Sequence, residues 1–313
     1  MKKIIIIGGA TASGKSSLAI KVAKKYNGEI ISADSRQIYK NIPQFTGVVL
    51  EEEMDNVPHH LISFLEEDEN FSSSEFSLKA ENKIEEILEK EKTPIIVGGS
   101  TFYFEPLIYK NLFPEVYKNL ELRSKLEKKE TIELFSSLKE KDQNRSENID
   151  PNNRPRLIRA LEIIEELGKV PEVNKIITDK YEIFFIWLSQ PIENQREKIA
   201  LNIKKRIEKG LLEEGKLVFN NFSKKYSNDN IKERFIKLGL GFKHIFDLWE
   251  NKIDLDEFIE KTKIEEGKYA KKQNTYLKKF FNELPVEIKK EKYDLLEEKY
   301  SLNVLKDVGI FLK

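Results

Sequence analysis

Short apolar runs alternate with amphipathic stretches over the first hundred residues of the chain. Three runs have the length and composition of buried strands: residues 4–7, 29–32 and 94–97. Between them, apolar residues recur at helical spacing over residues 18–26 and 76–88, and Ser73 or Ser74 is expected to cap the second helix. Strands and helices alternating at this pitch predict right-handed crossovers and a parallel sheet.

Beyond residue 110 the pattern becomes polar and helical. An apolar stripe of Leu157, Leu161, Ile164 and Leu167 stops at Gly168, as a helix end would. Residues 181–188 are rich in Ile and Phe and predict a fourth core strand. The helices between residues 110 and 179 are therefore an insertion into the sheet domain.

The last third of the chain is helical in pattern nearly throughout, including residues 264–281. Leu295, Leu296 and Tyr300 indicate one more helix near the end. The expected fold class is α/β, with a parallel-sheet core that has helices on both faces. Its expected parts are a core of residues 1–110 and 180–200, a helical insertion of residues 111–179, and a helical C-terminal region of residues 201–313 packed on the core.

Charge and composition narrow the classes of function. Lys plus Arg and Asp plus Glu both number 54 in 313 residues, so a polyanion must be held by local patches. The absence of cysteine excludes disulfides and thiolate chemistry. The first apolar run is too short for a signal peptide or a membrane span. We expect a cytoplasmic protein that does not associate with membranes.

A glycine-rich loop follows the first predicted strand and precedes the first predicted helix. It consists of Gly9, Ala10, Thr11, Ala12, Ser13, Gly14, Lys15 and Ser16, the pattern of a phosphate-binding loop, or P-loop. Backbone N–H groups of such a loop point inward at a helix start, where the helix dipole also favours anions. Lys15 reaches the outer phosphates, and the Ser16 hydroxyl can ligate Mg²⁺. The alternative is an ordinary turn with an exposed lysine, and the loop alone does not identify its phosphate compound.

Two further segments follow predicted strands and so belong at the same edge of the sheet. Asp34 ends the second strand, where its carboxylate can accept a proton from a nucleophile or cap a turn. Gly98, Gly99 and Ser100 follow the third strand, where a typical P-loop ATPase has a metal-binding aspartate. ATP hydrolysis is therefore disfavoured. The glycines let another backbone approach the ligand, and the Ser100 hydroxyl can donate to a leaving-group oxygen.

Eight segments together resemble the tRNA dimethylallyltransferase family, also called isopentenyl-tRNA transferases. They are residues 9–16, 29–39 (EIISADSRQIY), 57–62 (VPHHLI), 94–100 (PIIVGGS), 150–162 (DPNNRPRLIRALE), 210–214 (GLLEE), 239–243 (GLGFK) and 269–275 (YAKKQNT). The resemblance implies transfer of a dimethylallyl group from dimethylallyl diphosphate to the N6 amine of adenosine 37, which lies next to the tRNA anticodon.

The resemblance also implies a role for individual residues. Asp34 is the general base, Lys15 and Ser100 are the other catalytic groups, and the P-loop holds diphosphate with Mg²⁺ at Ser16, without ATP. The adenosine must leave its stack to reach Asp34. We expect a monomer that binds the tRNA anticodon stem-loop through Asp34, Ser35, Arg36, Gln37, Ser100, Arg123, Arg154, Arg156, Arg159, Lys271, Lys272 and Gln273.

From the residues alone, several of these contacts have an alternative interpretation. Arg156 and Arg159 lie one turn apart on a predicted helix, where they either follow a phosphate backbone or pair with local glutamates. On the C-terminal helix we interpret the aromatic side chains, Tyr269 and Tyr276 among them, as core and the lysines as contacts to the tRNA backbone.

Among the positions that depart from the family's pattern, two replace a basic residue that would help to bind phosphate. Val48 stands where the family has a lysine, and Asn202 stands where it tends to carry an arginine near the diphosphate. The cations that could compensate are Lys198, Lys204, Lys205 and Arg206. Two rival hypotheses therefore stay open. One is a small-molecule kinase on the same core, which would not need the basic insertion, and the other is a tRNA-binding protein that has lost its activity.

Overall fold

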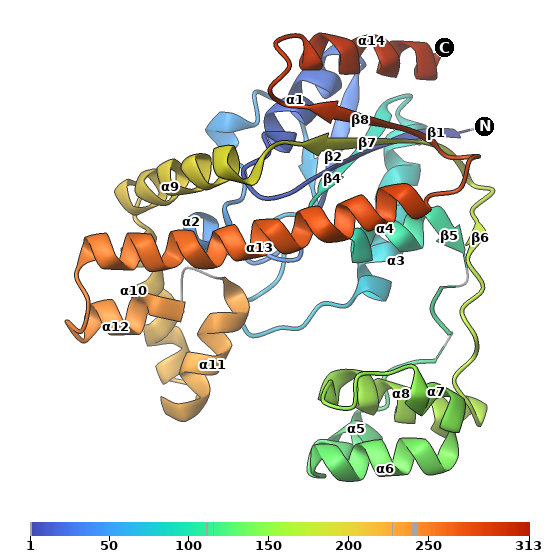
Figure 1. The fold of residues 1–313 in the computed structure, drawn as a ribbon, viewed down its shortest axis with the longest axis vertical. Helices are drawn as coiled ribbons and strands as arrows, with labels where there is room; N and C mark the ends of the chain where they lie inside the picture. The colour runs from blue at the N-terminus through green and yellow to red at the C-terminus, as the bar shows by residue number, and fades with distance from the viewer. Residues whose placement is uncertain (1, 111, 115, 227, 240–242) are drawn as a thin grey trace. The chain divides into compact units, whose positions relative to one another are not determined.

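The computed structural model describes residues 2–110, 112–114, 116–226, 228–239 and 243–313 and contains one large sheet (Figure 1). Most of the family-like segment 239–243 lies outside these residues. Six strands lie in the order β3-β2-β4-β1-β7-β8, and every neighbouring pair is parallel. They are β1 (Lys2–Gly9), β2 (Gly28–Ala33), β3 (His59–His60), β4 (Thr93–Gly98), β7 (Tyr181–Ser189) and β8 (Lys289–Asp294). The predicted α/β class with a parallel sheet is confirmed.

Strand β1 lies in the middle of the sheet, between β4 and β7. Ile7 pairs with Val97 on one side and with Ile186 on the other. Because both faces of a central parallel strand are covered, the isoleucines at positions 4–7 are all fully buried. The carboxyl end of β1 therefore delivers the P-loop to the middle of one sheet edge.

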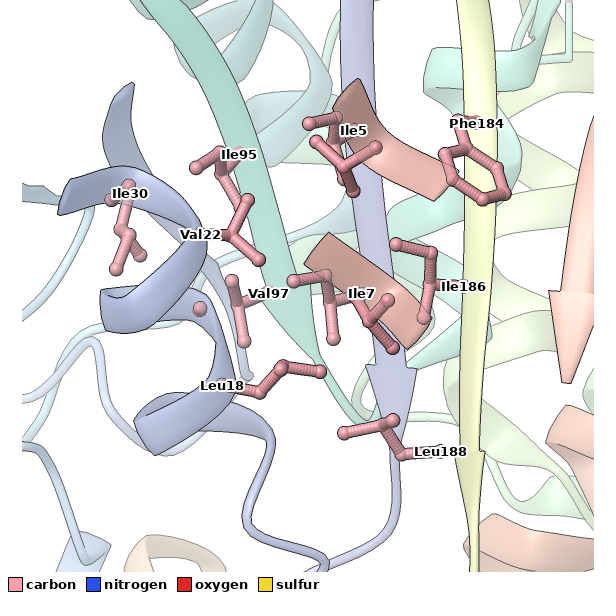
Figure 2. Close-up of a cluster of buried hydrophobic side chains, with 14 of the residues drawn as sticks. Ile5, Ile7, Leu18, Val22, Ile30, Ile95, Val97, Phe184, Ile186 and Leu188 are labelled. Atoms are coloured by element: carbon pink, nitrogen blue, oxygen red, sulfur yellow. The ribbon is translucent and has the colours of Figure 1, made fainter. Parts of the chain in front are cut away.

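Helices α1 (Lys15–Lys25) and α14 (Tyr300–Leu312) cover one face of the sheet. Figure 2 shows Leu18 and Val22 of α1 beside side chains of three strands, among them Ile7, Val97 and Ile186. Each fully buried side chain of this kind stabilises the fold by roughly 2 kcal/mol. The side chains of this cluster tie the helix that follows the P-loop to the centre of the sheet.

The other face carries α3 (Ser73–Glu89), α4 (Thr101–Ile108) and α13 (Leu255–Glu283). Phe104 of α4 and Phe280 of α13 pack on Phe185 of β7, with ring centroids 5.7 Å and 5.4 Å from it. A Cβ at Gly8 would meet Phe185 at 3.0 Å and Leu277 of α13 at 3.1 Å. The sheet thus has helices on both faces, as predicted, and α13 runs against it closely.

A group of helices continues this part of the chain beyond the sheet. It comprises α2 (Pro43–Thr46), the 3₁₀ helix η1 (Glu51–Glu53), α9 (Ile192–Glu208), α10 (Leu211–Ser223), α11 (Asn228–Leu238) and α12 (Ile245–Trp249). Together with the first half of α13 they enclose a separate apolar core that includes Phe45, Ile199, Val218, Phe235 and Phe258. The helical C-terminal region is therefore present. No helix within the described residues is both long and apolar enough to cross a bilayer.

Residues 109–177 form a second compact unit with its own core. Its elements are β5 (Tyr109–Lys110), α5 (Leu120–Leu126), α6 (Thr131–Lys141), α7 (Gln143–Glu147), α8 (Arg154–Leu167) and β6 (Ile176–Ile177). Leu157, Leu161 and Ile164 of the stripe predicted on α8 share a core with Leu134 and Leu138 of α6, whereas Leu167 is exposed. Gly168 ends α8 in the left-handed conformation at φ 79°, which glycine adopts without strain.

Three details of the fold differ from the sequence predictions. Ser72, not Ser73 or Ser74, caps α3, because its hydroxyl and the Glu75 side chain form a reciprocal capping box. Strand β8 was not predicted, since its sequence KKEKYD is polar and only Tyr293 in it is buried, as suits an edge strand. Leu295 and Leu296 precede the last helix instead of belonging to it.

Candidate active site

The P-loop connects β1 to α1 through a tight turn. The Ser13 N–H donates to the Ala10 carbonyl at 3.1 Å, and Gly14 precedes the helix in the left-handed region at φ 71°. Ala12 is also left-handed, at φ 61°. The first turn of α1 has N–H groups without partners in the helix, so the loop and helix start form a site suited to an anion.

A pocket of about 350 Å³ opens over this loop. Charged residues in its lining, among those that the structure describes, are Lys15, Asp34, Arg36, Glu53, Lys205, Arg206, Lys209 and Glu266. Cations thus outnumber carboxylates, and the volume suits a small ligand. A small anionic ligand matches both the charge and the size of the pocket.

Lys15 is the most buried cation of the pocket, with 9% of its surface exposed. Burial lowers the pKa of its ammonium, and the nearby Asp34 carboxylate opposes that shift without cancelling it. The charge of Lys15 is therefore only partly compensated. An anion bound in the pocket would stabilise this charge.

Asp34 follows β2 and lines the same pocket. Its Oδ1 accepts a hydrogen bond from the Arg36 N–H at 3.0 Å, so the carboxylate also fixes the turn after the strand. One oxygen of Asp34 thus holds the turn, as one of the two interpretations predicts, and the residue lines the pocket.

Tyr269 of α13 forms another part of the pocket wall, although we predicted it as a core residue. The Arg36 guanidinium lies 4.3 Å from the centroid of its ring, a stacked cation–π contact. Burial, followed by the negative charge of Asp34, raises the pKa of the Tyr269 hydroxyl, which therefore stays neutral. The prediction for Tyr276 was wrong, because its side chain is 55% exposed.

The two positions at which a basic residue of the phosphate site is replaced both line the pocket. Val48 and Asn202 face it, and so do Lys205 and Arg206, two of the four candidates for compensation. Arg206 is already engaged by Glu266 at 2.5 Å. Lys198 instead donates to the Gln190 side chain at 3.0 Å. Lys205 is thus the candidate with the most freedom to meet an anion.

The wall around Val48 is held by a half-buried carboxyl group. Glu214 of α10 accepts from the N–H groups of Gln44 and Phe45 at 2.9 Å and 3.2 Å, which anchors the start of α2. Burial raises the pKa of Glu214 to about 7, although these N–H groups favour its charged form.

Gly98 ends β4 and Gly99 follows it, and both lie close to neighbouring parts of the protein. A Cβ at Gly98 would lie 2.0 Å from the Ala33 carbonyl oxygen, and a Cβ at Gly99 would lie 2.3 Å from the Gln273 side chain. The close approach they permit is to neighbouring protein, because β2 and α13 lie against them. Ser100 follows at the same sheet edge but is absent from the described lining of the pocket.

Of the four insertion arginines expected to contact tRNA, three make contacts within their own unit. Arg123 forms a two-pronged ion pair with Glu162, at 3.0 Å and 2.6 Å. The guanidinium of Arg159 donates to the Val116 carbonyl at 2.8 Å, and that of Arg154 to the Glu127 carbonyl. Arg156 is exposed. Arg159 also lies 3.7 Å from Glu162. Local pairing therefore describes Arg123 and Arg159, whereas Arg156 is open to an external phosphate.

The expected tRNA contacts outside the insertion occupy different environments. Ser35, Lys271 and Lys272 are exposed, and Arg36 and Gln37 are part of the pocket wall. Gln273 is buried, with its side chain bonded to Thr11 in the P-loop. The lysines of this segment of α13 therefore face solvent, and its glutamine faces the loop.

Two residues at the P-loop were missed by the sequence analysis. Gln190 and Gln195 are both buried and donate to P-loop carbonyls. The sequence could have indicated Gln195. It continues the helical spacing of Ile199 and Ile203, at a position where an apolar residue is expected. A polar residue in such a stripe must find a partner.

The fold and the pocket together define the class of protein: a P-loop α/β protein with a cationic pocket that an aspartate also lines. A sequence profile of the family described as IPP transferase matches residues 37–280. The tRNA dimethylallyltransferase of Alkaliphilus oremlandii (strain OhILAs) is 37% identical over 290 residues, which cover 90% of each chain. That of Acetivibrio thermocellus is 38% identical over 324 residues and covers both chains completely.

Solved structures agree with these relatives. The full-length tRNA isopentenylpyrophosphate transferase from Bacillus halodurans matches with a TM-score of 0.68 and 27% identity, over 100% of this chain and 97% of its own. A eukaryotic dimethylallyltransferase acting on tRNA matches with a TM-score of 0.87 and 27% identity, over 100% of this chain and 80% of its own. This chain belongs to the tRNA dimethylallyltransferase family, which decides against the small-molecule kinase.

Proposed function

We propose that this protein transfers the dimethylallyl group of dimethylallyl diphosphate to the N6 amine of adenosine 37 in tRNA. The coarser activity, enzymatic prenyl transfer to tRNA, follows from the family. One observation supports the finer proposal: the buried ammonium of Lys15 and the carboxylate of Asp34 face one pocket of about 350 Å³. The same pocket thus provides a carboxylate that can accept a proton and a cation that can pair with a leaving anion.

The proposed reaction makes one bond and breaks one. The N6 lone pair attacks the allylic C1 carbon as the bond between C1 and the diphosphate oxygen breaks, and diphosphate leaves with that electron pair. The N6 proton passes to the Asp34 carboxylate, which is useful because the lone pair of an aromatic amine is delocalised and weakly nucleophilic. Lys15 and the loop N–H groups stabilise the charge on the departing diphosphate.

Mg²⁺ is the expected cofactor, and the site offers a protein ligand for it, a hydroxyl group of the P-loop. The Ser16 hydroxyl lines the pocket beside Lys15, as a P-loop metal ligand does. Among the described residues, no three His, Cys, Asp or Glu side chains converge on a metal position. Mg²⁺ is commonly held by few protein ligands together with substrate phosphates, so Ser16 and the diphosphate would share it. When bound, the ion would neutralise diphosphate charge.

For the tRNA, we propose that the anticodon stem-loop supplies a flipped adenosine to the pocket. Arg36 and Gln37 line the pocket wall beside Asp34, where a base and its neighbours would enter. The exposed side chains of Arg156, Lys271 and Lys272 are positioned on the surface to contact backbone phosphates. Further contacts in this proposal are Arg123, Arg154, Arg159, Ser35 and Ser100. The protein acts as a monomer.

A reconstituted reaction tests this function. The protein is mixed with Mg²⁺, dimethylallyl diphosphate and unmodified tRNA that carries adenosines at positions 36 and 37, and the nucleosides are then weighed by mass spectrometry. We expect N6-dimethylallyl-adenosine at position 37 only and release of diphosphate. Turnover of ATP without a prenylated nucleoside would contradict the proposal.

The base is tested by Asp34→Asn, which keeps an acceptor oxygen for the Arg36 N–H. Loss of a general base is expected to lower kcat by roughly 10²–10⁴-fold while tRNA binding is kept. Asp55→Asn is the matched control, because Asp55 is an exposed partner of Lys24. Near-normal turnover by Asp34→Asn would show that another group takes the proton.

A further inference from the structure

The backbone of the P-loop is held from outside by three buried glutamines. Gln273 of α13 accepts from the Thr11 N–H at 2.8 Å and from the Thr11 hydroxyl at 3.0 Å. Gln195 of α9 donates to the Thr11 carbonyl at 3.3 Å, and Gln190 donates to the Ala12 carbonyl at 3.0 Å. We propose that these three side chains, the glutamine brace, are positioning residues for the diphosphate site.

The need for such a brace follows from the geometry of the loop. A loop that aims N–H groups at an anion turns carbonyl groups the other way, and buried carbonyls require donors. The carbonyls of Thr11 and Ala12 receive them from glutamine amides. Ala12 also has a φ of 61°, which costs a residue with a Cβ some energy and persists only when the surroundings impose it. The brace supplies that constraint.

Each amide of the brace is fixed in orientation by a second contact. The Gln190 oxygen accepts from Lys198 at 3.0 Å, and the Gln195 oxygen accepts from Asn274 at 2.7 Å. A glutamine side chain with both ends bonded cannot turn over its amide without loss of hydrogen bonds. The donors that meet the loop are therefore held in place before any ligand arrives, which is how a preorganised site avoids rearrangement during the reaction.

Gln273 has the widest reach of the three. Its amide nitrogen lies 3.5 Å from the Gly99 carbonyl, so one side chain joins the P-loop to the loop after β4. Gly99 leaves the space for it, because a Cβ there would come within 2.3 Å of that nitrogen. This contact gives a physical reason for glycine at position 99.

This inference rests on the proposed function. Binding of inorganic diphosphate tests the inference separately from that function. This binding is measured by calorimetry with Mg²⁺ and without tRNA. Gln273→Leu is expected to weaken binding roughly tenfold, the effect of losing one or two buried hydrogen bonds, and to leave tRNA affinity unchanged. Ile264→Ala, an exposed change on the same helix, should leave both affinities unchanged. If the unaltered protein does not bind diphosphate, the proposed function fails first.

A second pair of variants distinguishes positioning from folding. Gln273→Glu keeps the acceptor for Thr11 but loses the donor toward Gly99 while it is ionised. Its kcat/KM relative to the unaltered protein should recover as the pH falls, because the protonated carboxyl group can donate again. Gly99→Ala should reproduce the loss in Gln273→Leu by displacing the amide. Unchanged diphosphate binding in Gln273→Leu, together with weaker tRNA binding, would overturn the inference and make Gln273 a tRNA contact.

Discussion

The pocket and the helical insertion both carry positive charge, but they hold it differently. In the pocket, burial lowers the pKa of Lys15, and the nearby Asp34 carboxylate only partly opposes that shift. In the insertion, Arg123 lies against the buried Glu162, which raises the pKa of its guanidinium. A buried cation without full compensation lowers the stability of the fold but can bind an anionic ligand strongly. A buried cation that is already paired with a carboxylate is needed by that carboxylate, and its charge is less available to a ligand.

The largest effect is expected from removing the buried cation of the pocket. Lys15→Met should lower kcat on the order of 10²–10³-fold, since it deletes a group aimed at the leaving charge. A lowered pKa means that the unfolded chain holds more protons between the folded pKa and 10.5, so Lys15 destabilises the folded state at neutral pH. Lys15→Met should therefore keep or raise the melting temperature. A clear fall in melting temperature would show that Lys15 is structural.

The matching change in the insertion should have the opposite pattern. Arg123→Gln leaves the Glu162 carboxylate buried, with Arg159 3.7 Å away as the remaining cation. We expect a loss of about 3 kcal/mol in the stability of this unit, the low end for a broken buried pair, because Arg159 compensates in part. Hydrogen exchange over residues 109–177 measures it. Unchanged protection with weaker tRNA binding would instead place Arg123 on the tRNA surface.

A smaller effect is expected from the exposed arginine of the same unit. Arg156→Ala removes no internal contact of the guanidinium that we describe, so the melting temperature should stay unchanged. Its tRNA affinity should fall, and the salt slope of binding should become shallower by about one unit, as for one lost phosphate contact. Measuring affinity at several salt concentrations checks this. An unchanged slope would show that this helix does not meet phosphate.

The elements of the fold could be predicted from the sequence where burial determines the pattern of hydrophobic residues. The isoleucines of β1 form the continuous apolar run of a strand that is covered on both faces. The stripe on α8 has the period of a helix that is covered on one face. Strand β8 was not predicted for the opposite reason. An edge strand with a single buried tyrosine has no hydrophobic period that the sequence could reveal. Its place in the sheet depends on long-range pairing with β7, which no local pattern encodes.

Only part of the candidate site could be predicted from the sequence, because only some of its residues belong to local motifs. Lys15 and Asp34 belong to local motifs that end strands, so the sequence could place them at one edge of the sheet. The roles of Gln190 and Gln195 depend on which backbone carbonyls they reach across the fold. The direction of Tyr269 was likewise fixed by packing, because a helical stripe of aromatic residues does not distinguish a core from a pocket wall.

The smallest expected effect concerns Glu214, a carboxyl group that anchors the wall of the pocket beside Val48. Its pKa of about 7 lies above the ordinary value of 4.5, so between these pH values the folded protein keeps a proton that the unfolded chain has released. This group's contribution to stability should therefore fall as the pH rises from 4.5 to 7. It should be constant outside that window, where both states have the same protonation.

Glu214→Gln tests this, because glutamine keeps an acceptor for the N–H groups of Gln44 and Phe45 and cannot ionise. The difference in unfolding free energy between this variant and the unaltered protein should change across pH 4.5–7 and level off beyond it. A flat difference would mean that the carboxyl group titrates normally, as it would if the α2 segment moved and let water in. In that case the pocket wall at Val48 is looser than the contacts of Glu214 indicate, and Lys205, which lines the same pocket, would contribute more to ordering the ligand.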